Sequence, residues 1–97
     1  MDADRILALV LDALRLTNQT RLAEAQLEVS PTAPIFGPAS PLDSLGLVGL
    51  LIDLEEACEQ AGYVVVLSDE RALSETRSPF RDVPSLAAYI ARLTAGE

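Results

Sequence analysis

The sequence predicts an all-α fold, a small bundle of three main helices and one short helix. The chain has 97 residues, which is enough for one modest hydrophobic core and too few for two. Leu and Ala dominate its apolar residues and aromatic residues make up only 4%, a composition that suits packing between helices better than a sheet. Three segments also repeat apolar residues at helical spacing. We therefore expect a single domain over residues 1–97.

The first helix is expected to begin at a cap formed by Asp2 or Asp4 and to end between Leu16 and Leu27. Its apolar residues recur with the helical period at Ile6, Leu7, Val10, Leu11 and Leu14. A long loop follows, because residues 29–42 contain four prolines and Gly37. Its large apolar pair, Ile35-Phe36, should attach this loop to the core.

The second helix is expected to start at Asp43 or Ser44 and to run to about Gln60, with Gly62 as a left-handed cap. One continuous stripe should face the core: Leu47, Leu50, Leu51, Leu54 and Cys58. Two aliphatic residues flank this stripe and carboxylates occupy the rest of the helix: Val48, Ile52, Asp53, Glu55, Glu56 and Glu59. The helix thus has a buried stripe, an apolar shoulder and an acidic back.

The segment after the second helix, residues 63–67, is predicted to be an extended connector that places Val64 or Val66 in the core. A short helix is expected from Asp69 to about Ser74. Asp82 should cap the last helix, which ends at Gly96 and has Pro84 in its first turn and an apolar stripe at Val83, Leu86, Ile90 and Leu93. Phe80, just before it, is expected to fill one end of the bundle.

The charge pattern limits the kinds of partner. The formal net charge is −8, and the seven basic residues are all Arg and dispersed. Nucleic acids and anionic membrane surfaces need clustered cations, so both are disfavoured. A basic protein partner fits the acidic surface better, and an acidity that serves only to keep the protein in solution explains the composition equally well. No apolar run approaches the length of a membrane span. With a single cysteine, Cys58, and no secretory signal pattern, we expect a cytoplasmic protein without a disulfide.

The residue types argue against an enzyme. A serine or cysteine nucleophile needs a neighbouring base, and the sequence has neither His nor Lys to assist Ser44 or Cys58. Zinc sites need clustered Cys and His, and the acidic run after Asp53 lacks the spacing of a calcium loop. We therefore expect no catalytic residues and no metal site. Cys58, on the apolar stripe, is interpreted as a small buried hydrophobic residue.

Ser44 allows two compatible interpretations. As a polar residue before an apolar periodic segment, Asp43 or Ser44 can simply cap the helix. The start of a helix is also where backbone amides and the helix dipole stabilise a phosphate. A hydroxyl at this position can therefore serve as an attachment point for a phosphate ester.

Two groups of residues carry a family resemblance. Asp43-Ser44-Leu45 is followed at the expected spacing by Val48, Leu50 and Leu54-Glu55-Glu56, and the chain closes with Phe80 and the run Leu86-Ala87-Ala88-Tyr89-Ile90. With these residues the sequence resembles an acyl carrier protein over nearly its whole length. It departs from the fatty-acid carriers at Gly46 and Gly49, where those carriers have acidic residues. The segment from Asp69 to Ser74, with Ser78-Pro79-Phe80 after it, looks more like the stand-alone carriers of specialised biosynthetic pathways.

The resemblance implies an up-and-down four-helix acyl carrier fold and a function without catalysis of its own. A phosphopantetheinyl transferase would join 4′-phosphopantetheine from coenzyme A to Ser44, with Asp43 and Leu45 recognised by the transferase. The arm would carry acyl groups as thioesters to acyl-loading and acyl-transferring enzymes, and the chain would be a monomer. We expect partners to bind the second helix through Val48, Ile52, Glu55, Glu56 and Glu59.

Two other functions remain open at this stage. An aminoacyl or peptidyl carrier would use the same serine, although such domains tend to have glycines just before it, where this chain has Pro41-Leu42-Asp43. A carrier-like adaptor would instead bind partners through the second helix, never carry an arm, and use Ser44 only as a cap.

Overall fold

A computed structural model describes residues 1–68 and 79–95, and in them every regular element is a helix. The elements are α1 (Ala3–Asn18), the short 3₁₀ helix η1 (Ala23–Ala25), α2 (Ser44–Gln60) and α4 (Val83–Thr94). The predicted all-α class is thus confirmed, and so are the three main helices. The short helix predicted from Asp69 to Ser74 and the end of the last helix at Gly96 lie outside the described residues.

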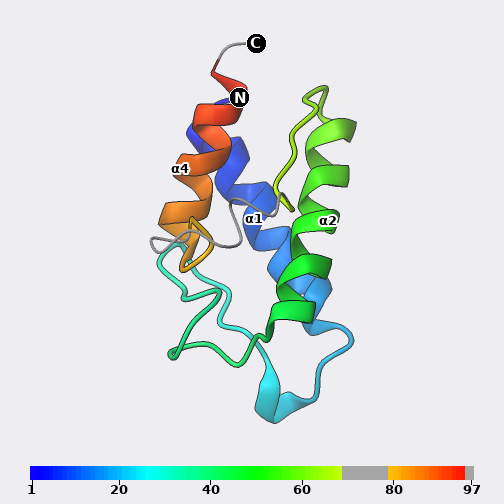
Figure 1. Cartoon of the computed structure of the whole chain (residues 1–97), viewed down its shortest axis with the longest axis vertical. Helices are drawn as coiled ribbons and strands as arrows, with labels where there is room; N and C mark the ends of the chain where they lie inside the picture. The colour runs from blue at the N-terminus through cyan, green and yellow to red at the C-terminus, as the bar shows by residue number, and fades with distance from the viewer. Residues whose placement is uncertain (69–78, 96–97) are drawn as a thin grey trace.

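The helix α1 lies between the other two main helices and packs against both of them. It runs antiparallel to α2 and to α4, which point the same way (Figure 1). The long loop between α1 and α2 crosses one end of the bundle, so the start of α2 lies beside the end of α1 (Figure 1). None of the described helices is long and apolar enough to cross a membrane.

Each main helix begins at an aspartate whose carboxylate accepts a hydrogen bond from a backbone N–H in the first turn. Asp2 accepts from Arg5 at 2.7 Å and Asp82 accepts from Ser85 at 2.9 Å. Asp43 does the same for α2. Such caps satisfy one of the donors that a helix start leaves without an intrahelical partner. Of the candidate caps at the first helix, Asp2 is therefore the one used.

The core is formed by one apolar stripe from each main helix. The predicted stripe of α2 is confirmed, since its residues are at most 2% exposed: Leu47, Leu50, Leu51, Leu54 and Cys58. Ile6, Val10 and Leu14 contribute from α1. Phe80 is fully buried before α4 and meets the Tyr89 ring edge to face, with 6.0 Å between ring centroids.

The predicted stripe of α4 is wrong at its last position. Leu93 is 37% exposed, and Thr94 is buried instead, with 3% of its surface exposed. Thr94 follows Ile90 by four residues and so continues the buried row of the helix. Its hydroxyl donates to the Ile90 carbonyl at 3.0 Å, which allows a polar side chain to be buried there.

The long loop is attached to the core as predicted, through the fully buried Ile35. The backbone N–H of Ile35 donates to the Arg81 carbonyl at 2.8 Å, and the N–H of Val83 donates to the Ala33 carbonyl at 2.9 Å. These two bonds form an isolated antiparallel bridge. The loop is therefore fastened to the first residues of α4.

The connector of residues 63–68 has the opposite register from the predicted one. Val64 and Val66 are 80% and 62% exposed, whereas Val65 and Leu67 are buried. The register is set at both ends. Gly62, with φ of +96°, turns the chain out of α2, so that the N–H of residue 63 bonds the Cys58 carbonyl at 2.9 Å. At the other end the backbone of residues 67 and 68 is held by a carboxylate of α2.

Candidate functional site

Ser44 is the first residue of α2, and its side chain is exposed at the end of the bundle that the long loop crosses. Its hydroxyl makes no hydrogen bond with the part of the chain that the structure describes. The preceding residue does the capping, since the Asp43 carboxylate accepts from the Gly46 N–H at 2.7 Å. The hydroxyl of Ser44 is thus left accessible to another molecule.

The turn before Ser44 is held by close packing between Leu42 and Gly46. Leu42 is 4% exposed, and its Cδ1 would lie only 2.6 Å from a Cβ at position 46. The Asp43 carboxylate oxygen would lie 3.1 Å from the same Cβ. A glycine therefore lets the loop enter the helix closely. Sequence reasoning treated Gly46 only as a departure from a family pattern, although a glycine in a first helical turn is a signal of close approach.

Arg21 ties the loop that leads into α2 to the segment after α1. Its Nε donates to the Ala25 carbonyl at 2.6 Å, and its Nη2 donates to the Pro41 carbonyl at 3.3 Å. Sequence reasoning assigned Arg21 no role, and nothing in its local pattern indicates one because its partners are backbone carbonyls, one of them twenty residues away. The position of Ser44 thus depends on an anchor twenty-three residues earlier in the sequence.

A groove of about 420 Å³ lies between the end of α1 and the first turns of α2. Gly49 lines it, and a Cβ there would meet no atom within 4 Å. The other lining residues are Leu16, Thr17, Gln19, Thr20, Arg21, Gly46, Leu50 and Asp53. Ser44 does not line this groove.

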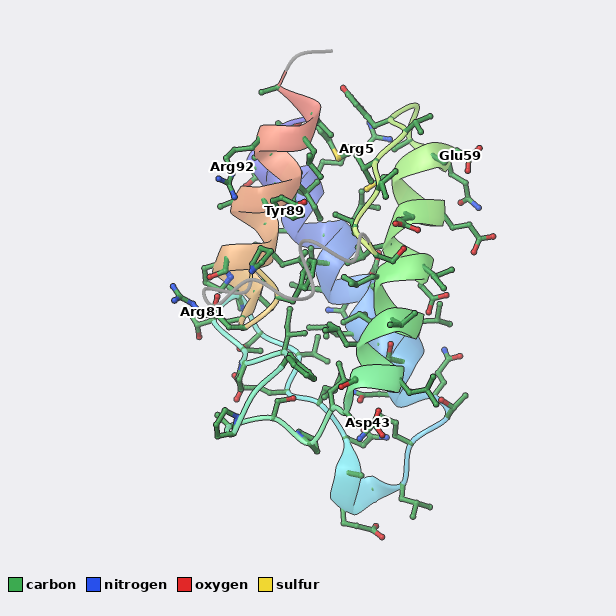
Figure 2. The ribbon with its side chains drawn as sticks, viewed as in Figure 1. Arg5, Asp43, Glu59, Arg81, Tyr89 and Arg92 are labelled. Carbon is green, nitrogen blue, oxygen red and sulfur yellow. The ribbon has the colours of Figure 1, made fainter. Side chains whose placement is uncertain are left out.

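The predicted partner-binding residues differ in their surroundings. Leu45 is 82% and Ile52 is 48% exposed, whereas Val48 is half-buried. The acidic residues Glu56 and Glu59 are exposed, and Figure 2 shows Glu59 at the opposite end of α2 from Asp43. The structure therefore presents apolar and acidic side chains along α2, and Leu45, directly after Ser44, is an exposed aliphatic residue.

Glu55 has a role inside the chain that the sequence did not indicate. Its Oε2 accepts three hydrogen bonds from the connector: from Leu67 N at 2.6 Å, from Ser68 N at 3.0 Å and from Ser68 Oγ at 3.1 Å. The carboxylate is partly buried. That Glu55 also binds a partner protein stays a prediction. In the structure its carboxylate is hydrogen-bonded to residues of its own chain.

The Ser44 hydroxyl is the accessible nucleophile at the start of α2. The sequence has no His or Lys, and the described residues contain no group of three or more side chains that could hold a metal ion. Cys58 is fully buried, and this burial, together with the negative charge of Glu55, raises the pKa of its thiol. The Ser44 hydroxyl thus has no His or Lys of this chain that could take its proton.

Comparisons with protein-family models, with curated proteins and with solved structures find no match.

Proposed function

We propose that this chain is an acyl carrier protein that bears a 4′-phosphopantetheine arm on Ser44. The observation that carries the proposal is the accessible hydroxyl of Ser44 at the first position of α2, with the cap supplied by Asp43 instead. The sequence resemblance around Asp43-Ser44-Leu45 supports the same function. The proposal includes a fourth short helix and the up-and-down four-helix bundle of the carrier fold.

The residues present fit a phosphate ester at this position. The first amides of a helix lack intrahelical partners, and the helix dipole favours a negative group near them. A phosphate on an exposed side chain also needs no desolvation. Ser44 would hold the arm, with Asp43 maintaining the turn and the exposed Leu45 contacting the transferase.

The arm would supply the thiol that the chain itself cannot offer. The single cysteine, Cys58, is fully buried and the pKa of its thiol is raised, so it is a poor site for an acyl thioester. A base of the transferase would take the proton of the Ser44 hydroxyl, whose oxygen would attack the pantetheine-bearing phosphorus of coenzyme A and release adenosine 3′,5′-bisphosphate. Such activation by another protein accounts for a site without a base. Acyl-loading and acyl-transferring enzymes would then act on the arm's terminal thiol.

The test is an intact-mass measurement after incubation with coenzyme A, magnesium and a promiscuous phosphopantetheinyl transferase. The parent chain should gain the mass of one phosphopantetheine group, and Ser44→Ala should gain none. Ser30→Ala serves as the matched control, because Ser30 lies in the loop fourteen residues before Ser44 and outside every helix, and this variant should be modified like the parent. No gain in the parent with several transferases would favour the unmodified adaptor.

A further inference from the structure

The connector of residues 63–68 has the features of a single β-strand that lies beside a helix instead of in a sheet. Its centre, Val64-Val65-Val66, is β-branched, and burial alternates from one residue to the next. Val64 and Val66 are mostly exposed, whereas Val65 is 8% exposed. This alternation is the pattern of an extended chain with one face on the core.

Both ends of the connector are fixed to α2. The N–H of Tyr63 donates to the Cys58 carbonyl at 2.9 Å, next to the Gly62 cap. Glu55 accepts from the N–H groups of Leu67 and Ser68 at 2.6 and 3.0 Å. The extended conformation is therefore already ordered, and a ligand that binds it loses less affinity to conformational entropy.

The backbone between these anchors has hydrogen-bonding groups that no described residue pairs with. The N–H and C=O groups of Val64 and Val66 form no hydrogen bond with any residue in the ranges 1–68 and 79–95. An extended segment with free backbone groups and exposed β-branched side chains can accept a further strand. Backbone pairing would give affinity, and the two exposed valines would contact alternate side chains of the added strand.

The charges around the connector indicate what kind of strand would bind. The chain has a net charge of −8, and α2, to which the connector is fixed, exposes Glu56 and Glu59. Such a surface attracts a segment flanked by Lys or Arg. A second copy of this chain fits poorly, because each copy has a net charge of −8 and would bring the same carboxylates to the interface.

We propose that residues 63–67 form a docking edge for an extended segment of a partner protein, with alternating aliphatic side chains between flanking Lys or Arg residues. The segment would add to the connector as a strand. Glu55 would act as a positioning residue that holds the edge in register. The proposal does not depend on an arm at Ser44, and it adds Val64 and Val66 to the surface expected on α2.

The test uses the full ¹⁵N-labelled chain and a synthetic peptide of alternating valine and threonine between lysine pairs. Binding should shift the amide signals of Val64 and Val66 and slow the exchange of their protons. The same peptide with N-methylated alternate amides keeps its side chains and charge but cannot pair, and it should bind about tenfold more weakly. Peptide binding should also weaken at high salt.

The double variant Val64→Asn/Val66→Asn should weaken binding of the unmethylated peptide by about tenfold or more. Leu22→Asn is the matched control, since Leu22 is 70% exposed and lies outside the connector, and it should bind like the parent. Equal binding of the methylated peptide, or no binding of either, would overturn the proposal. So would protection of the Val64 and Val66 amides in the free monomer, or dimerisation through them.

Discussion

The carboxylate of Glu55 on α2 accepts a hydrogen bond from the backbone N–H of Leu67, with 2.6 Å between Oε2 and N. The same oxygen accepts from both the backbone and the side chain of Ser68. One carboxylate thus replaces the strand or helix partner that this backbone otherwise lacks. Because Leu67 is fully buried, the bond also fixes which side of the connector faces the core.

We expect Glu55→Gln to lower the free energy of unfolding by about 1–2 kcal/mol, because the charged acceptor of three partly buried hydrogen bonds is replaced by a neutral amide. Glu56→Gln is the matched control, with the same change in charge on an exposed neighbour. It should alter stability by less than about 0.5 kcal/mol. Urea unfolding of both variants provides the measurement. Equal losses of unfolding free energy would show that the three hydrogen bonds to Glu55 contribute no stability.

Gly46 and Gly49 should respond oppositely to alanine. Gly49→Ala should stabilise the chain by up to about 1 kcal/mol, because its Cβ meets no atom within 4 Å and alanine is the better helix former. At Gly46 the new Cβ would press on the buried Leu42, at 2.6 Å from its Cδ1. Gly46→Ala should therefore gain nothing or lose stability. Urea midpoints compare the two, and an equal gain at both positions would contradict close packing at Gly46.

Much of this fold follows from local patterns. Residues only a few positions apart determine the aspartate caps, the left-handed conformation of Gly62 and the buried stripe of α2. The structure confirms all three. The hydrogen bonds of Glu55, which fix the register that buries Val65, join residues 12 or 13 positions apart. Several exposed carboxylates on α2 look alike in sequence, so no pattern shows which of them turns toward the connector.

The candidate site was predictable to a similar extent. The pattern predicted a helix start at Asp43-Ser44, which the structure confirms. The support beneath it comes from Arg21 bonding the Pro41 carbonyl and from Leu42 packing on Gly46. Backbone carbonyls carry no sequence signal, so the anchoring role of Arg21 emerges only from the three-dimensional structure.

Ile90 and Leu93 on α4 should differ strongly when truncated. Ile90→Ala should cost about 2–5 kcal/mol, because Ile90 is 1% exposed and its loss leaves a cavity in the core. Leu93→Ala should cost well under half as much, since Leu93 is 37% exposed. Thermal unfolding by circular dichroism provides the comparison. A similar loss at both positions would restore the stripe that the sequence predicted.

Asp82 should make the free energy of unfolding depend on pH in the acidic range. Burial raises the pKa of Asp82, but hydrogen bonds from Ser85 and the charge of Arg81 outweigh it, so the pKa lies below its usual value. The stabilisation is therefore present above the usual aspartate pKa of about 3.9 and is lost as the pH falls through the folded-state pKa. Asp82→Asn should keep a cap and flatten the stability profile over this acidic range. Profiles from urea unfolding that coincide for variant and parent would contradict this.

Charge reversal on α2 should slow association with the transferase that modifies Ser44. Glu56→Lys and Glu59→Lys remove exposed carboxylates that attract a basic partner, so the second-order rate constant of modification should fall severalfold at low salt. Asp4→Lys makes the same change in charge on α1 and should leave this rate nearly unchanged. The difference should shrink at high salt, because the screening length falls from about 10 Å at 0.1 M to about 3 Å at 1 M. If Asp4→Lys slows modification as much as the α2 variants, net charge and not the surface of α2 controls the encounter.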